Sequence, residues 1–240
     1  MKRPFARTLV HAAVFGLLTC FSAIVFAGVD QVKAAIQKRH PDLNIKSVQT
    51  TPVNGLYEVF TNGQILYVTE DAAYVLAGAS LIDDEKKRNL TLERLKILTS
   101  IKFDTLPLAD AIAIKKGSGK YKFAIFSDPD CPYCKQLESG LNTQGLTDFT
   151  VYVFLFPLPS HKDAKWKAES IWCAKDREAA WHDWMLNGKL PERANCDNPI
   201  ERNLKLGNEI GVTGTPTIYL GDGTQAASLQ EVVDAINVDP

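Results

Sequence analysis

The sequence has no excess of charge of either sign, no internal repeat and no low-complexity tract. Its 240 residues include 27 Lys and Arg against 28 Asp and Glu, a formal net charge of −1. A nucleic-acid-binding domain carries a strongly basic face, so composition argues against a nucleic-acid partner. Histidine is scarce as well, and the four residues are scattered, with no visible metal set or Cys–His hydrolase arrangement. We expect no metal and no other cofactor.

Cysteine is also scarce, and its use depends on where the protein goes. Three basic residues within the first seven precede a mostly apolar run over 8–26, and small side chains at Val25 and Ala27 suit a signal peptidase. We expect residues 1–27 to be a cleaved signal peptide that exports the chain. The alternatives are an uncleaved membrane anchor, since the run is nearly long enough to span a bilayer, and lipidation of Cys20. Cleavage leaves four cysteines, too few for a disulfide-stapled scaffold of this size.

The first part of the mature chain has the pattern of a small α+β domain. A helix is predicted over 29–39, followed by alternating apolar stretches over 45–53, 56–61, 65–69 and 74–82. Asn54-Gly55 and Asn62-Gly63 separate three of these stretches and predict type I′ hairpins. The charged cluster 83–88 is interpreted as a linker or helix entry, and a connecting helix is predicted over 90–101. We expect an N-terminal domain over 28–88, a linker helix over 89–103 and a second domain over 104–240.

The second part alternates strands and helices, which is typical of an α/β domain with a crossover connection. Strands are predicted over 121–126, 150–156 and 216–220. The middle one is almost wholly apolar, as in a strand buried on both faces. Helices are predicted from Cys131 onward, over roughly 162–186 and 200–209, and over 229–236.

Cys131-Pro132-Tyr133-Cys134 lies where the first of these strands meets a helix. Pro132 suits the first helical position, which makes Cys131 the N-cap. Unpaired N–H groups and the positive end of the helix dipole there stabilise a thiolate, the attacking species in disulfide exchange. We therefore expect Cys131 to attack and Cys134, one turn inside the helix, to resolve. Half of a zinc site is an alternative, but no second pair accompanies it; a purely structural Cys131–Cys134 disulfide is another.

Taken together, the chain resembles DsbC-type periplasmic disulfide isomerases of the thioredoxin superfamily. The matching segments are FSDPDCPYC (126–134), IWCAKD (171–176), Cys196 and GVTGTP (211–216). The resemblance implies a thioredoxin-like catalytic domain with a helical insertion at about 135–200, and a homodimer joined through the N-terminal domains. The dimer's cleft would hold misfolded, disulfide-containing periplasmic proteins and give chaperone activity, and a DsbD-type membrane reductase would keep the CxxC pair reduced.

The resemblance also implies roles for particular residues. Pro216 is expected to follow a cis peptide bond, although most X-Pro bonds are trans, leaving the backbone of Thr215 free to pair with a substrate strand. Pro132 and Tyr133 complete the expected substrate-binding set. Cys173 and Cys196 are expected to form a structural disulfide, which the oxidising compartment also favours.

Two departures from the family pattern leave questions about the chemistry open. DsbC-type proteins often have Gly-Tyr between the cysteines, whereas Pro-Tyr is the DsbG dipeptide. Ile125 occupies the position of thioredoxin's buried Asp, so Asp128 and Asp130 are candidates for accepting the Cys134 proton, although both also suit a turn. The alternatives to an isomerase are a DsbG-like reductase of sulfenylated cysteines, a dimeric chaperone and, least favoured, a DsbA-type oxidase.

Overall fold

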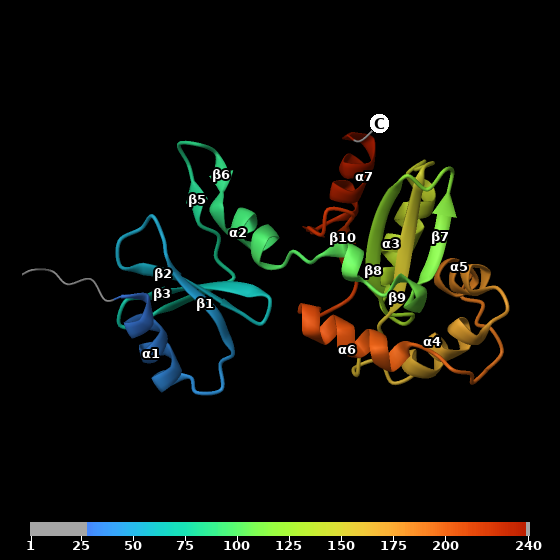
Figure 1. The fold of residues 1–240 in the computed structure, drawn as a ribbon, viewed down its shortest axis with the longest axis horizontal. Coiled ribbons are helices and arrows are strands. Elements are labelled where there is room, and N and C mark those ends of the chain that lie inside the picture. The colour runs from blue at the N-terminus through green and yellow to red at the C-terminus, as the bar shows by residue number, and fades with distance from the viewer. Residues whose placement is uncertain (1–27, 239–240) are drawn as a thin grey trace, which may run out of the picture.

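The computed structural model describes residues 28–238, which form two lobes joined by a helix and a short extended segment (Figure 1). The predicted signal peptide lies outside the described residues. Between residues 28 and 238, no helix combines the length and the apolar character needed to cross a membrane.

The N-terminal lobe packs one helix against a four-stranded antiparallel sheet. After α1 (Val29–Arg39), the sheet has the order β1 (Ile45–Thr50), β2 (Leu56–Thr61), β3 (Gln64–Thr69) and β4 (Val75–Ala77). Its core joins Val32 and Ile36 of α1 to Val59 and Val68 of the central strands. The helix and the first three strands confirm the predicted elements, with β1 ending earlier than expected.

The two Asn-Gly pairs differ in the structure. Asn62 and Gly63 have φ of 48° and 75°, so the predicted type I′ turn joins β2 to β3. At Asn54-Gly55 only the glycine has positive φ, so the type I′ prediction there is wrong. The Thr51 hydroxyl bonds to the carbonyls of Val53 and Leu56, and these bonds stabilise a wider loop in place of the tight turn.

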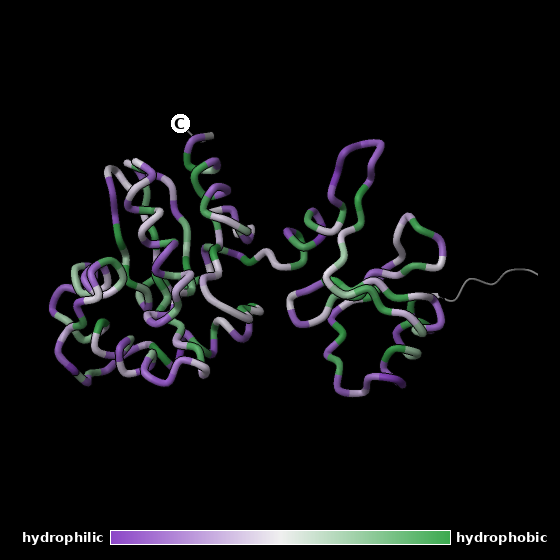
Figure 2. Tube along the Cα trace, turned by 180° about the vertical axis from the view of Figure 1, so that it is seen from behind, coloured by the Kyte–Doolittle hydropathy of each residue, from purple (hydrophilic) through white to green (hydrophobic). Residues whose placement is uncertain are grey.

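The connection between the lobes also departs from prediction. The cluster over 83–88 is not a linker: it forms the tip of a two-stranded arm, β5 (Ile82–Asp83) and β6 (Arg88–Asn89), hydrophilic in Figure 2. Asp83 accepts a hydrogen bond from the Lys86 amide, which closes the turn. Helix α2 (Leu90–Leu98) ends before the predicted residue 101, because the hydroxyls of Thr99 and Ser100 bond back to helix carbonyls.

The C-terminal lobe has a five-stranded sheet of order β11-β10-β8-β9-β7. Strands β8 (Tyr121–Ser127) and β9 (Phe149–Leu155) are parallel, and β7, β10 and β11 pair antiparallel. The structure confirms the predicted strands as β8, β9 and β10 (Thr217–Leu220). Strands β7 (Ile112–Lys116) and β11 (Gln225–Ala226) were not predicted.

Helices cover both faces of this sheet. On one face, α3 (Pro132–Thr143), α5 (Arg177–Asn187) and α7 (Leu229–Val238) pack on Phe123, Ile125 and Val151. On the other, α6 (Ile200–Ile210) and the 3-10 turns Phe103–Thr105 and Leu108–Asp110 pack on Phe126, Phe154 and Tyr219. The helical insertion expected at about 135–200 corresponds to α4 (Ala164–Cys173) and α5 only. Part of α3 and all of β9 fall within that range but belong to the α/β core, because their apolar side chains fill it.

Candidate active site

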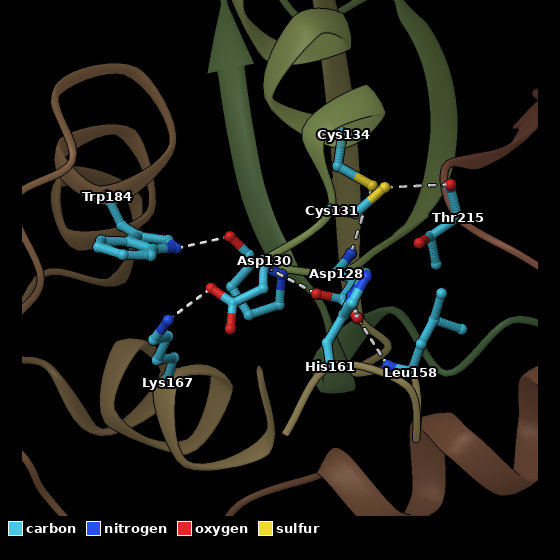
Figure 3. Close-up of polar contacts among 10 residues, drawn as sticks. Asp128, Asp130, Cys131, Cys134, Leu158, His161, Lys167, Trp184 and Thr215 are labelled. Carbon is cyan, nitrogen blue, oxygen red and sulfur yellow. Dashed lines mark hydrogen bonds and ion pairs between the residues drawn. The ribbon is translucent and has the colours of Figure 1, made fainter. Parts of the chain in front are cut away.

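The CxxC pair lies where β8 gives way to α3, at the end of the sheet (Figure 3). Cys131 is the N-cap of α3 and Pro132 its first residue, as the sequence predicts. Both cysteines are unpaired thiols with little exposure, 4% for Cys131 and 2% for Cys134. Between them, Pro132 and Tyr133 are exposed, Tyr133 to 69%. The exposed surface of the motif therefore consists of the Pro132 and Tyr133 side chains, while both sulfur atoms are largely buried.

The loop before β10 faces Cys131. Its Thr215–Pro216 peptide bond is cis. The Cys131 thiol donates to the Thr215 carbonyl oxygen, with Sγ 3.3 Å from it, rather than capping the helix through a side-chain bond. Thr217 pairs with Phe126 in the sheet, which holds this loop beside the end of β8. Residues 84 positions apart are thus brought together by sheet pairing.

The two thiols have different surroundings. Burial raises the pKa of the Cys134 thiol to about 12, and its sulfur accepts a hydrogen bond from the Asp128 amide at 3.5 Å. Cys134 is therefore a neutral thiol at physiological pH. Cys131, at the helix N-terminus, lies where backbone N–H groups favour negative charge. This asymmetry suits Cys131 to attack as a thiolate and Cys134 to stay protonated in the resting site.

Asp128 anchors the active-site loop on one side. Its carboxylate is fully buried and accepts hydrogen bonds from the amides of Asp130 and Leu158, both at 2.6 Å, and from His161 Nδ1 at 2.9 Å. Its oxygens are turned toward these donors, whereas its amide faces Cys134. The carboxylate therefore holds the loop against residues 158–161.

A second anchor lies on the insertion helices. Asp130 pairs with Lys167 of α4 at 2.6 Å, and Trp184 of α5 donates its indole N–H to the Pro129 carbonyl at 2.6 Å (Figure 3). Both candidate acids are thus engaged in fixing the loop, the turn-forming interpretation that the sequence also allowed.

Cys173 and Cys196 form a disulfide that joins the last residue of α4 to the loop before α6. The bond spans 23 residues and encloses the whole of α5. Among residues 28–238, no group of three or more His, Cys, Asp or Glu side chains is arranged to hold a metal ion.

Comparison with known proteins places the chain in a family. A model described as a thioredoxin-like domain matches residues 108–235, and one described as the disulfide bond isomerase N-terminal domain matches residues 23–92. A probable thiol:disulfide interchange protein DsbC of Bordetella avium is 42% identical over 83% of this chain and 70% of its own length. The DsbC of Escherichia coli K12 is 33% identical over 90% of this chain and 89% of its own. The chain belongs to the DsbC family.

A solved structure supports the fold over about half of the chain. A disulfide interchange protein from Neisseria gonorrhoeae is 41% identical and aligns with a TM-score of 0.51, covering 56% of this chain and 98% of its own. The family and the fold class predicted from the sequence, a thioredoxin-like domain with a helical insertion and a small N-terminal domain, are both confirmed.

Several residues near the site were not singled out by sequence reasoning. His161 is one of the four scattered histidines for which no role was predicted. Lys167 lies 37 residues from Asp130 and Trp184 lies 55 residues from Pro129. No local pattern marks such contacts. The one available signal was Asp130 itself, a carboxylate directly before a cysteine whose thiolate it would oppose.

Proposed function

We propose that this DsbC-family chain is a periplasmic thiol–disulfide interchange enzyme that isomerises or reduces non-native disulfides, with Cys131 as nucleophile and Cys134 as resolving thiol. The observation that carries the proposal is the pair of unbonded thiols at the N-terminus of α3, one of them against the Thr215 carbonyl. The chemistry needs no cofactor, because the two sulfurs carry the electrons themselves.

The cycle starts when the Cys131 thiolate attacks a substrate disulfide. The Cys131–substrate S–S bond forms as the substrate bond breaks, and the departing substrate sulfur leaves as a thiolate. That thiolate attacks another bond of the substrate and finally releases Cys131, so that the disulfides are rearranged with no net electron transfer. When this fails, Cys134 loses its proton and attacks Cys131, which gives an oxidised enzyme and a reduced substrate.

The high pKa of Cys134 favours isomerisation in this cycle. At about 12, it leaves very little thiolate at neutral pH, so resolution by Cys134 is slow until the mixed disulfide changes its surroundings. A mixed disulfide that persists gives the substrate time to rearrange. A DsbD-type membrane reductase is the proposed source of electrons when Cys131–Cys134 does form.

The proposed substrate-binding residues are Pro132, Tyr133, Thr215 and Pro216. The Thr215 carbonyl accepts a hydrogen bond from the Cys131 thiol in the structure. Once Cys131 has lost its proton, that carbonyl is free to accept a backbone N–H from the substrate, in the manner of an added strand. Tyr133 is 69% exposed and is therefore accessible to a substrate that approaches Cys131. The proposed substrates are misfolded disulfide-containing proteins of the periplasm.

The proposed assembly is a homodimer joined through N-terminal domains over residues 28–88, with residues 89–103 as linker and 104–240 as catalytic domain. The isomerase N-terminal domain is the dimerisation domain of the family. Strand β4 lies at the sheet edge, and Tyr74, Val75 and Leu76 are 74%, 47% and 48% exposed. An apolar, unpaired edge strand is a template for pairing with a second chain. DsbC homologues are periplasmic, and the proposed signal peptide over 1–27 would export this one; chaperone activity follows from the dimer's cleft.

Refolding of ribonuclease with scrambled disulfides tests the proposal. Cys131→Ser is expected to abolish recovery of activity, whereas Cys134→Ser should form trapped mixed disulfides with the substrate. Recovery by the Cys131→Ser variant would rule out the assignment. Little activity on the scrambled enzyme together with efficient reduction of a sulfenylated thiol would favour a DsbG-like reductase instead. A cysteine-free variant that fully suppresses aggregation and still replaces the wild-type protein in cells that lack it would favour a chaperone.

A further inference from the structure

Asp130 poses an electrostatic problem that the proposed chemistry does not address. It immediately precedes Cys131 in the chain. A negative charge near the attacking sulfur opposes formation of the thiolate. The structure places one cation directly on this carboxylate, Lys167 of α4, with Nζ 2.6 Å from Asp130 Oδ1. The side chains of Lys167 and Asp130 are only 14% and 18% exposed, so solvent screens the pair weakly.

We propose that Lys167 is a positioning residue for disulfide exchange: it neutralises Asp130 and, with Trp184, holds the Pro129–Asp130 turn so that Cys131 keeps its reactive place at the helix N-terminus. This inference rests on the proposed role of Cys131 as nucleophile. Lys167 acts through Asp130 and the loop, and is assigned no contact with the substrate.

Trp184 contacts both the Pro129–Asp130 turn and Lys167. Its indole N–H donates to the Pro129 carbonyl, while the Nζ atoms of Lys167 and Lys135 lie 4.7 Å and 4.2 Å from its ring centroid. A cation over the face of an indole is attracted by the ring's quadrupole, most strongly when it is desolvated. The ring thus keeps Lys167 near the loop, and Lys135 near the start of α3, where its amide donates to the Cys131 carbonyl.

Other charged groups around the loop are already accounted for by their own contacts. On the opposite side, Asp128 is held by His161 and two amides. Farther along α3, Glu138 pairs with His182 and Trp181 of α5. The groups that face the turn are therefore Cys134, Lys135, Asp128, His161 and Lys167, of which Lys167 alone is hydrogen-bonded to the Asp130 carboxylate in the described contacts.

The test is the pH dependence of Cys131 alkylation by iodoacetamide in the reduced full mature chain, followed by mass spectrometry of the modified peptide. Lys167→Met leaves Asp130 unpaired and should move the midpoint of the rate profile to higher pH by up to about one unit. Because a more basic thiolate is also a better nucleophile, the rate below the midpoint should fall only about threefold. Asp130→Asn should move the midpoint the opposite way.

The double variant separates charge from structure. If Lys167 acts by neutralising Asp130, the Lys167→Met, Asp130→Asn chain should return to within about twofold of the wild-type rate, and Lys167→Arg should keep the wild-type midpoint. The matched control is Lys165→Met on the same helix, whose Nζ is also 2.6 Å from a carboxylate, that of Glu201, and should leave the profile unchanged.

An unshifted profile for Lys167→Met, or a double variant as slow as Lys167→Met, would overturn the inference. Should Lys167→Met fail to fold, Asp130→Asn alone decides: an unchanged or higher midpoint refutes it. Alkylation reads the reactivity of Cys131 without any protein substrate. A failed isomerase assay with the predicted shifts would therefore reject the proposed function while leaving the Lys167 assignment in place.

Discussion

Removing the Cys173–Cys196 disulfide should destabilise the C-terminal lobe by about 3 kcal/mol. The bond spans 23 residues, and the chain-entropy relation gives about 3.4 kcal/mol at 25 °C for a closed loop of that size. Cys196 is exposed and Cys173 is only partly buried, so replacing both with alanine opens little cavity. Most of the loss should therefore come from the greater freedom of the unfolded chain. The change to make is the double variant Cys173→Ala, Cys196→Ala, which leaves neither partner of this bond as an unpaired thiol.

The assay is urea unfolding followed by tryptophan fluorescence. All four tryptophans lie between Trp166 and Trp184, so the signal reports this lobe and not the N-terminal one. A chain with Cys131→Ala and Cys134→Ala serves as the control, because a reductant then breaks only the second bond and should reproduce the loss without any substitution. A loss below about 1 kcal/mol in both experiments would refute the reasoning, since it would mean that the bond hardly restricts the unfolded chain.

Three further predictions concern the Cys134 thiol of the reduced protein, the partly buried imidazole of His182 and the edge strand of the N-terminal sheet. The pKa of Cys134 is raised from 9.0 to about 12, so the unfolded chain loses this proton first as pH rises. The free energy of unfolding of the reduced protein, measured in urea, should therefore fall above pH 9, by about 1 kcal/mol at pH 10. Cys134→Ala should lack this dependence on pH, and an identical dependence in that variant would contradict the assignment. A hydrogen bond from His182 to Glu138 raises the pKa of the imidazole, so its stabilisation is present below about pH 6.5 and is lost as pH rises through the higher folded pKa. His182→Gln should therefore lower the free energy of unfolding more at pH 5.5 than at pH 9, with a difference well under about 1 kcal/mol because the side chain is 32% exposed. An equal loss at both pH values would count against this assignment. Leu76→Lys on the exposed edge strand β4 should shift the protein from dimer to monomer in analytical ultracentrifugation. The matched control is Leu92→Lys on α2, where the leucine is 50% exposed, and this variant should stay dimeric. An unchanged dimer in Leu76→Lys would place the interface elsewhere.

Local chemistry decided which parts of the fold could be predicted. Asn62 and Gly63 both have positive φ and form the predicted type I′ turn, whereas at Asn54-Gly55 the Thr51 hydroxyl donates to the carbonyls of Val53 and Leu56. Strand β7 was not predicted, because its five residues alternate only briefly and because it pairs with β9, almost forty residues later. Its place in the sheet depends on this long-range pairing, which no local sequence pattern indicates.

The same distinction applies to the site. Cys131 as N-cap and Pro132 as first helical residue follow from the order of four residues. The contacts that fix the loop do not, because Lys167, Trp184 and His161 reach it from more than 30 residues away. Burial of Cys134 likewise depends on how helices pack over the sheet. The sequence could therefore name the reacting atoms but not the groups that hold them.

The role of Cys131 and Cys134 is best decided by the thiol state of the protein trapped by acid straight from the periplasm. An isomerase or reductase should have two free thiols, at Cys131 and Cys134, with Cys173 and Cys196 bonded to each other. A protein with Cys131 and Cys134 fully oxidised would contradict it, because that state accepts electrons from substrates and marks an oxidase.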